Sequence, residues 1–208
     1  MESLAVSGGG RGLAALLSRA TGLQADALAR FQQLDGGAVD VFVTTPFECL
    51  ASRRILATPS RNHAVVAAAD LLAALRSGSE TVGSARDTSW PGALPPADGF
   101  TERDVVPVAV ARQLADEGRN LARQFSGPAG PPKSLLDSVV LTADTESADP
   151  VEIPMRMIFT CTSLGLIPGF AAPDDVPRHL RVATAGRWTR IDAPFGSVYH
   201  SAQLNLLF

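Results

Sequence analysis

The sequence predicts an α+β fold, with helices mainly in residues 11–126 and a mostly antiparallel sheet in residues 137–201, packed as two layers. The main observation is a change of hydrophobic rhythm near Pro131, where apolar residues three and four apart give way to apolar residues that alternate with polar ones. The composition agrees, because 208 residues that are 46% hydrophobic and 19% charged can bury a substantial core. Residues 11–208 are therefore expected to form one domain, or alternatively two lobes jointed at residues 127–132.

The first ten residues are expected to form a flexible tail. They include the run Gly8-Gly9-Gly10, which loses much backbone entropy on ordering and offers almost nothing to pack. This glycine run lacks the preceding strand and the Lys-Ser or Lys-Thr pair of a nucleotide-binding loop, so it does not predict a phosphate site.

The elements before residue 77 are predicted from periodicity and from helix start signals. Apolar residues between Leu13 and Phe31 recur at three and four, as on one face of a helix. Thr45, Pro46 and Glu48 match a capping box, in which Thr caps the helix and Glu bonds back to the cap. The predicted order is a helix over 13–31, a strand over 39–44, a helix that begins at Thr45 and a helix over 60–75.

Residues 77–103 form a long connection without helical or strand periodicity. Glycine, proline, serine and threonine dominate it, and such connections are uncommon inside compact domains. The segment is therefore a lid, a wrap or a disordered insert. Trp90, Leu94 and Phe100 favour a wrap, because a solvated linker rarely carries large apolar groups.

The last half of the chain is predicted to contain one helix followed by strands. Residues 107–125 carry the clearest apolar stripe of the sequence. Gly186 and Arg187 fit a two-residue hairpin turn that pairs Val182 with Ile191 on one face and Arg181 with Asp192 on the other. The predicted strands cover residues 139–143, 151–161, 180–185, 188–193 and 198–200. The apolar run 204–208 is expected to dock on protein rather than lie free in water.

The charge and hydropathy patterns predict a cytoplasmic protein that binds neither nucleic acid nor membrane. The formal charge is −3, and the arginines are scattered rather than gathered into a basic stripe. No stretch approaches the ~20 apolar residues of a membrane-spanning helix. The apolar run 13–17 is too short for a secretory signal.

No metal or cofactor is expected from the sequence. Two cysteines, Cys49 and Cys161, are too few for a disulfide framework or a four-ligand metal site. The three histidines, at positions 63, 179 and 200, show no ligand spacing such as His-x-x-x-His.

Cys49 and His63 are the candidate catalytic residues. Cys49 follows a predicted strand and lies in the first turns of a predicted helix, where the helix dipole favours a thiolate. A phosphatase-like loop needs arginine six residues later, but that position holds Ile55, while Arg53 and Arg54 fall too early. A buried, inert cysteine is the alternative, because free cysteine is among the most buried residue types.

The candidate binding residues are Trp188, Arg190 and Arg181, on the outer face of the predicted hairpin, together with Trp90. Tryptophan and arginine are enriched at binding hot spots, since one buries a large rigid surface and the other makes directed, charge-assisted hydrogen bonds. The alternative is that helices of the same chain cover this face, so that Trp188 belongs to the core and Arg181 pairs with Asp192 at its edge.

Three segments of the chain, residues 90–96, 134–137 and 187–192, resemble segments of uncharacterised proteins from high-GC Gram-positive, actinobacterial-type bacteria. The similarity covers most of the chain beyond residue 60. It implies a bacterial cytoplasmic protein and carries no activity.

Two hypotheses of function follow. The first is a non-catalytic cytoplasmic protein that binds a protein partner or self-associates, through the outer sheet face or the apolar run 204–208. The second is a small-ligand-binding protein or thiol-dependent enzyme whose pocket lies under the 77–103 loop, with Cys49, His63 or Arg54 contributing.

Overall fold

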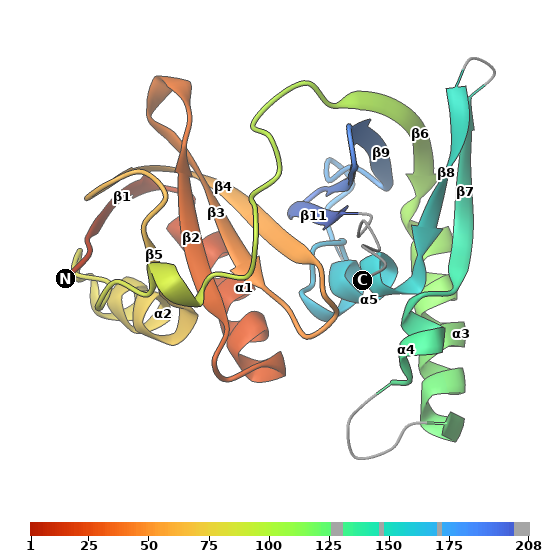
Figure 1. Cartoon of the computed structure of the whole chain (residues 1–208), viewed down its shortest axis with the longest axis horizontal. Helices are drawn as coiled ribbons and strands as arrows, with labels where there is room; N and C mark the ends of the chain where they lie inside the picture. Colours follow the sequence, from red (N-terminus) through yellow and green to blue (C-terminus); the bar gives the residue numbers. More distant parts are fainter. Residues whose placement is uncertain (126–130, 146–147, 170–171, 202–208) are drawn as a thin grey trace, which may run out of the picture.

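The chain folds as two halves joined by a long connection (Figure 1). The computed structural model describes residues 1–125, 131–145, 148–169 and 172–201. We call residues 1–77 the first half, residues 78–100 the strap and residues 101–201 the second half.

Each half contains both strands and helices. The first half contains β1 (Leu4–Gly8), α1 (Gly10–Leu23), β2 (Leu28–Gln33), the 3-10 turn η1 (Asp35–Gly37), β3 (Ala38–Thr44), β4 (Leu50–Pro59), β5 (Val65–Ala67) and α2 (Ala68–Ser77). The strap contains the 3-10 turn η2 (Asp87–Ser89). The second half contains β6 (Thr101–Pro107), α3 (Val108–Phe125), α4 (Lys133–Leu136), β7 (Val139–Thr145), β8 (Ala148–Pro154), α5 (Met155–Ser163), β9 (His179–Ala185), β10 (Trp188–Ala193) and β11 (Gly196–Ser201).

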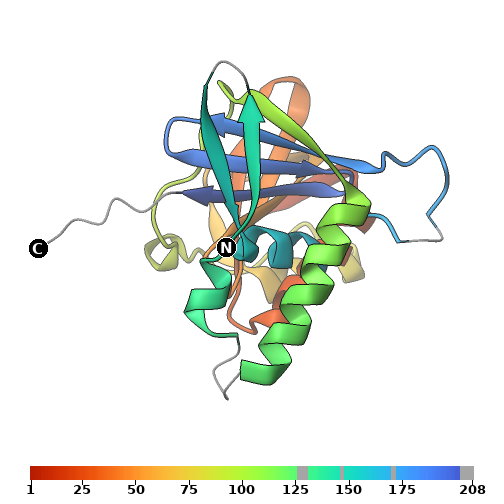
Figure 2. The ribbon, with the colours of Figure 1, turned by 90° about the vertical axis from the view of Figure 1, so that its right-hand side faces the viewer.

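One antiparallel sheet runs through both halves. Its strand order is β5-β2-β3-β4-β11-β10-β9-β6, with β1 paired to the far end of β4. Strand β4 is long enough to pair with β1 near its end and with β11 near its beginning, so it belongs to both halves. The joint itself is the register Leu50 with Tyr199 and Ser52 with Ser197. Strands β7 and β8 form a separate hairpin beside β6, at the α3 end of the molecule (Figure 2).

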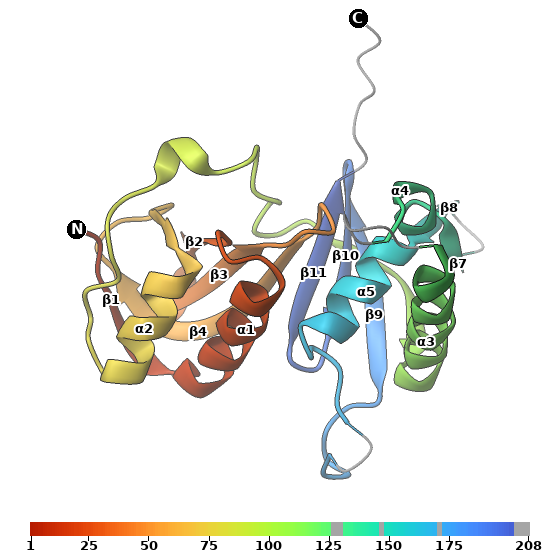
Figure 3. The ribbon, with the colours of Figure 1, turned by 90° about the horizontal axis from the view of Figure 1, so that it is seen from below.

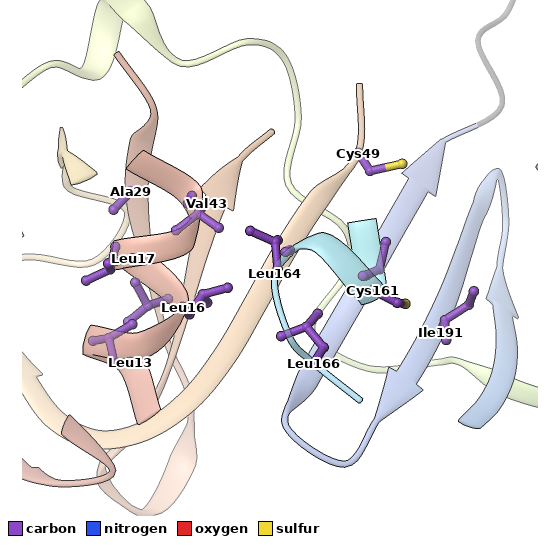
Figure 4. Packing of buried hydrophobic residues seen from close by; sticks show 14 of the residues in the cluster. Leu13, Leu16, Leu17, Ala29, Val43, Cys49, Cys161, Leu164, Leu166 and Ile191 are labelled. Carbon is purple, nitrogen blue, oxygen red and sulfur yellow. The ribbon is translucent and has the colours of Figure 1, made fainter. Parts of the chain in front are cut away.

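The helices cover one face of this sheet, and the strap crosses the other (Figure 3). Helix α1 lies beside α2 in the first half, and α3 lies beside α5 in the second. In both halves the helices place leucines against the sheet, as Leu16 of α1 and Leu164 after α5 show (Figure 4). Burial of these apolar faces is the main stabilising contribution, at about 25 cal/mol per Å².

The predicted α+β class is confirmed, with a mostly antiparallel sheet and helices α1, α2 and α3 between Gly10 and Phe125. The helix predicted over 107–125 is α3. The predicted hairpin is also correct in register, because Val182 lies opposite Ile191 and Arg181 opposite Asp192. Its turn places Gly186 at φ +53°, a conformation that glycine adopts without steric cost.

The sheet begins much earlier in the chain than predicted. Residues 4–8, expected to lie in a flexible tail, form β1, because pairing with β4 supplies the hydrogen bonds and buries Leu4. The predicted helix over 13–31 ends at Leu23, and residues 28–33 form β2. The predicted helix over 60–75 begins only at Ala68, after β5. The predicted strand over 151–161 ends at Pro154, where α5 begins. In each case contacts with distant segments outweigh the local pattern.

The prediction of a helix that begins at Thr45 is wrong. Residues 45–48, which match a capping box, form a tight turn instead. The Thr45 hydroxyl donates a hydrogen bond of 2.7 Å to the Cys49 carbonyl and accepts one of 3.4 Å from the Phe47 amide. Glu48 has φ +56°, a left-handed conformation that no helix continues. The turn reverses the chain from β3 into β4.

The strap is a wrap, one of the three alternatives that the sequence left open. The amide of Arg86 donates a hydrogen bond of 2.8 Å to the Val65 carbonyl, and the Asp87 carboxylate accepts one of 3.1 Å from the Val65 amide, so the strap covers the edge of β5. Trp90 is only 8% exposed.

No described helix is long and apolar enough to cross a membrane. The expected docking of residues 204–208 lies outside the described residues.

Candidate binding groove beneath the strap

A groove with a volume of about 950 Å³ lies where the two halves meet under the strap. One side is formed by Arg86, Ser89 and residues 91–93 of the strap. The opposite side is formed by the end of β11 and the beginning of β10. Its floor comes from the first half. The floor residues are Gln24, Asp26, Leu28, Thr44, Thr45, Glu48, Cys49 and Leu50.

Trp188 lies on the groove wall, at the first position of β10. It is opposite Ser201 in the β10–β11 register, so both are on the sheet face that the strap crosses. Its ring is only partly buried and packs against an outer-face cluster of aromatic and apolar residues. The buried members of this cluster are Phe42, Val65, Trp90 and Tyr199. The sequence hypothesis that helices cover this face is therefore wrong, because the strap covers part of it and Trp188 borders open space.

Trp90 anchors the strap and is not among the residues that line the groove. The guanidinium carbon of Arg30 lies 5.6 Å from the centre of its ring, a distance suited to a cation–π interaction. The strap is thus held on β2 by the contact between Trp90 and Arg30, and on β5 by its hydrogen bonds with Val65. Trp90 belongs to the outer-face cluster that also contains Phe42, Val65 and Tyr199.

Arg190 and Arg181 border a second hollow of about 390 Å³, separated from the groove by Tyr199. Arg190 forms an ion pair of 2.9 Å with Asp192, and its guanidinium carbon lies 4.1 Å from the Phe100 ring centre. Arg181 lies opposite Asp192 in the register and is exposed. The four candidate binding residues therefore lie on one face of the sheet, but only Trp188 lines the groove.

Cys49 borders the groove, yet its thiol is poorly suited to chemistry. Its residue is 3% exposed, and burial raises the pKa of the thiol to about 12, despite a hydrogen bond with Thr160 that lowers it. Burial also raises the pKa of Cys161. Both cysteines are unbridged. A nucleophilic thiol requires a lowered pKa, so this environment disfavours the thiol-dependent alternative.

Neither cysteine is expected to react with a thiol reagent in the folded protein at pH 8. A rise in pKa from 9 to about 12 lowers the thiolate fraction of Cys49 about a thousandfold. The unfolded protein should react at the rate of a free thiol, which serves as the control. Because the unfolded thiol ionises near pH 9 and the folded one near pH 12, the free energy of unfolding should also fall as pH rises above about 9. Rapid native modification at pH 8 would contradict this account.

The other catalytic candidates lie away from the groove. His63 has φ +62° in the turn before β5, where its amide bonds to the Phe31 carbonyl. Burial and the neighbouring Arg30 charge lower the pKa of His63. Arg54 makes a two-point ion pair with Asp40, with bonds of 2.8 and 2.7 Å, on the outer face. The structure does not bring Cys49, His63 and Arg54 together in one site.

A buried arginine holds the groove floor in place. Arg156 of α5 has a side chain only 2% exposed, and its Nη1 donates hydrogen bonds of 2.9 Å to the Phe47 carbonyl and 2.7 Å to the Glu48 carboxylate. Its Nη2 pairs with Asp137. Burial alone would lower the pKa of Arg156, but Asp137 and Glu48 raise it above its ordinary value. Arg156 thereby ties the turn between β3 and β4 to the second half.

No local pattern in the sequence indicated this group of residues. Arg156 fell in a predicted strand, and Glu48 was interpreted as part of a helix cap. His200, beside them, has its pKa lowered by burial and by the Arg156 charge. Tyr199 fell within the strand predicted over 198–200, where neighbouring side chains point to opposite faces, and this was the one signal that could have found it. Among the described residues, no group of three or more His, Cys, Asp or Glu could hold a metal ion.

The fold is similar to the fold of DNA polymerase sliding clamps. The sliding clamp of Caulobacter crescentus is 11% identical, with a TM-score of 0.57 over 99% of this chain and 67% of that chain. The sliding clamp of Pseudomonas aeruginosa is 13% identical, with a TM-score of 0.56 over 99% of this chain and 66% of that chain. C. crescentus pol III beta is 11% identical, with a TM-score of 0.56 over 97% and 65%. This chain thus spans about two thirds of the length of these clamp chains.

The chain belongs to the family described as a domain of unknown function, DUF8185, whose model matches residues 95–205. A second family, described as a domain of unknown function, DUF8010, matches residues 3–92. The two matches meet within the strap. The boundary between them therefore differs from the joint expected at residues 127–132, most of which lie outside the described residues. No curated protein matches the sequence.

Proposed function

We propose that this chain is a non-catalytic cytoplasmic protein that holds an apolar segment of a protein partner in the groove beneath the strap. The observation that carries the proposal is the groove itself, with a volume of about 950 Å³ at the junction of the two halves. Peptide and ligand sites favour such concave places, where apolar walls bury the ligand and a few polar groups orient it.

The lining of the groove suits a peptide better than a small charged ligand. Leu28, Leu50 and Trp188 supply apolar contact area, and tryptophan is the residue type most often found to dominate binding energy. Glu48 and Arg187 supply charges of both signs at the same groove, which suits the mixed polar rim of protein interfaces. A site with both signs selects against strongly charged partners.

We do not include nucleic acid among the proposed partners, although the similar solved structures are named as DNA polymerase clamps. The chain has a formal charge of −3. Two arginines of the outer face, Arg54 and Arg190, are paired with Asp40 and Asp192. Paired guanidinium groups contribute little to the counterion release that drives binding to phosphate backbones. The absence of nucleic-acid binding stays a prediction.

The proposal is tested with a phage-displayed library of random heptapeptides selected on the immobilised full chain. We expect enrichment of peptides with alternating large apolar side chains. A synthetic representative should bind the Trp188→Ala variant at least about tenfold more weakly, as for a hot-spot residue. The matched control is Leu56→Ala, which removes an exposed apolar side chain of β4 outside the groove and should leave binding unchanged. Selection of no peptide, or equal binding to both variants, would refute a peptide site here.

Self-association is a second candidate function, favoured by exposed apolar side chains at the α3 end of the molecule. Four of the seven exposed large apolar residues in the described part of the chain lie there, on β6, α3 and β7. They are Val105, Val110, Leu121 and Val139. Val110 and Leu121 are eleven residues apart, so they lie on one stripe of the helix. Sedimentation velocity should show a mass above 21.7 kDa that falls in a Val110→Ser, Leu121→Ser double variant. A monomer at every concentration would exclude this candidate.

A further inference from the structure

The second hollow, with a volume of about 390 Å³, is lined mainly by charged and hydroxyl-bearing side chains. It lies on the outer face of the sheet, where the pairing of β3 with β4 and of β10 with β9 and β11 brings distant residues together. A further lining arginine, Arg53, belongs to the opposite face, because a Cβ atom on Gly12 of α1 would meet its guanidinium carbon. The charged side chains of the outer face are Asp40, Arg54, Arg181, Arg190 and Asp192.

Both aspartates of the hollow are already engaged within the protein. Asp40 accepts hydrogen bonds of 2.8 and 2.7 Å from Arg54, one at each carboxylate oxygen. Asp192 pairs through one oxygen with Arg190 at 2.9 Å, and its other oxygen accepts a hydrogen bond of 2.6 Å from the Ser197 hydroxyl. Each of the four carboxylate oxygens therefore has a partner, and each aspartate neutralises one arginine.

Arg181 is the outer-face arginine that these two aspartates leave over. It lies opposite Asp192 in the register, and its side chain is exposed. Within the part of the chain that the structure describes, its guanidinium makes no hydrogen bond and no ion pair. Three guanidinium groups thus share the hollow with two carboxylates, which leaves one positive charge for a ligand. A free guanidinium fits a carboxylate well, because its planar fork donates two parallel hydrogen bonds.

Arg190 and Tyr199 add donors whose positions are fixed by packing. The guanidinium carbon of Arg190 lies 4.1 Å from the centre of the Phe100 ring, a distance suited to a cation–π interaction that holds the guanidinium in place. Tyr199 is 6% exposed, and burial raises the pKa of its hydroxyl, so the phenol keeps its proton and remains a donor. A site with fixed donors loses little conformational entropy when a ligand binds.

We propose that the second hollow binds one carboxylate group, which bonds to Arg181 and lies beside Arg190. A carboxylate fits better than a phosphate ester, because the outer-face excess is a single positive charge and a phosphate ester carries about −1.5 to −2 at neutral pH. An acidic side chain of a protein partner and a free small carboxylic acid share this chemistry. The inference goes beyond the proposed function, because it concerns a site separate from the groove.

The test titrates the full chain with sodium acetate and follows the arginine Nε–H resonances in ¹⁵N spectra at pH 6.5. Among the described residues, the Nε of Arg190 is buried and has no hydrogen-bond partner, so its proton is shielded from water and serves as the reporter. An Arg190→Lys variant identifies the resonance. Sodium chloride at the same ionic strength controls for screening of charges.

The variant that removes the unpaired arginine is Arg181→Gln. Its matched control is Arg11→Gln, which removes an exposed arginine of α1 that lines neither the groove nor the second hollow. We expect acetate, but not chloride, to shift the Arg190 resonance along a saturable curve. Acetate should bind the Arg181→Gln variant about tenfold or more weakly, because a charge-assisted pair of hydrogen bonds is lost. The Arg11→Gln control should bind acetate like the natural chain.

A second titration distinguishes the two sources of the carboxylate. Its probes are two tripeptides with blocked ends, Ala-Glu-Ala and Ala-Gln-Ala. Tighter binding of the glutamate tripeptide than of acetate would assign the hollow to an acidic side chain of a partner. Binding of acetate without binding of the tripeptide would assign it to a free small acid.

Two results would overturn the inference. If acetate leaves the Arg190 resonance in place, or shifts it no more than chloride does, the hollow binds no carboxylate. If the Arg181→Gln variant binds acetate as tightly as the natural chain, the unpaired arginine does not form the site. Neither result bears on the groove, which is tested separately with the Trp188→Ala variant and library-selected peptides.

Discussion

Replacing Arg156 by alanine is expected to lower the free energy of unfolding by about 3 kcal/mol. The arginine is buried and holds Glu48, Asp137 and the Phe47 carbonyl at once. Its loss removes two ion pairs, leaves a buried carbonyl without that donor and opens a cavity beneath the groove. The two carboxylates are 55% and 49% exposed, so water replaces part of what they lose, and the expected value lies at the low end for a buried pair. Urea unfolding followed by circular dichroism measures the change.

The matched control is Arg119→Ala, which removes the same side chain from the surface of α3. Arg119 pairs with Asp116 at 2.6 Å, with exposures of 45% and 69%. Such exposed pairs contribute about 0–1 kcal/mol, so the control should unfold almost like the natural protein. Equal stability of the two variants would show that Arg156 does not link the halves.

Replacing Gly196 by alanine is expected to destabilise the protein by about 2–4 kcal/mol. Gly196 begins β11 with φ +151°, a conformation that side chains rarely adopt. A Cβ atom here would lie 2.4 Å from the Ser52 carbonyl oxygen of β4. Because that atom belongs to the backbone of the strand that joins the halves, it cannot move aside without breaking the β4–β11 register. Urea unfolding measures the loss.

Gly186→Ala is the control for backbone strain without a steric clash. Gly186 has φ +53° in the β9–β10 turn, and a Cβ atom there would meet nothing within 4 Å. Its expected cost is about 1 kcal/mol. If the two alanine variants are equally stable, the close approach at Ser52 does not limit the joint between the halves.

Local pattern was sufficient where an element is stabilised mainly by its own sequence. The stripe of residues 107–125 predicted α3, and the turn at Gly186 predicted the register of β9 and β10. The local pattern was insufficient where pairing with another strand determines the secondary structure of a segment. Residues 4–8 are glycine-flanked and short, but β4 provides their hydrogen bonds, and so they form a strand.

Only those parts of the candidate site that depend on local sequence could be predicted. Trp188 was identified because its place in the hairpin follows from the local turn, and the pocket under the 77–103 loop was one of the two functional hypotheses. Arg156 and Glu48 were not identified, because their ion pair joins residues 108 positions apart in the chain. Cys49 was identified by its place beside a predicted helix that does not form.

Local patterns were enough to predict the α+β class, the helix over 107–125 and the hairpin of β9 and β10, because these depend on periodicity and turn geometry within short segments. Three features became visible only in the folded chain: one sheet unites both halves, the strap lies over a groove, and a buried arginine holds the floor of that groove. These features depend on pairings between residues far apart in the chain, and a single sequence does not encode such pairings in any local pattern.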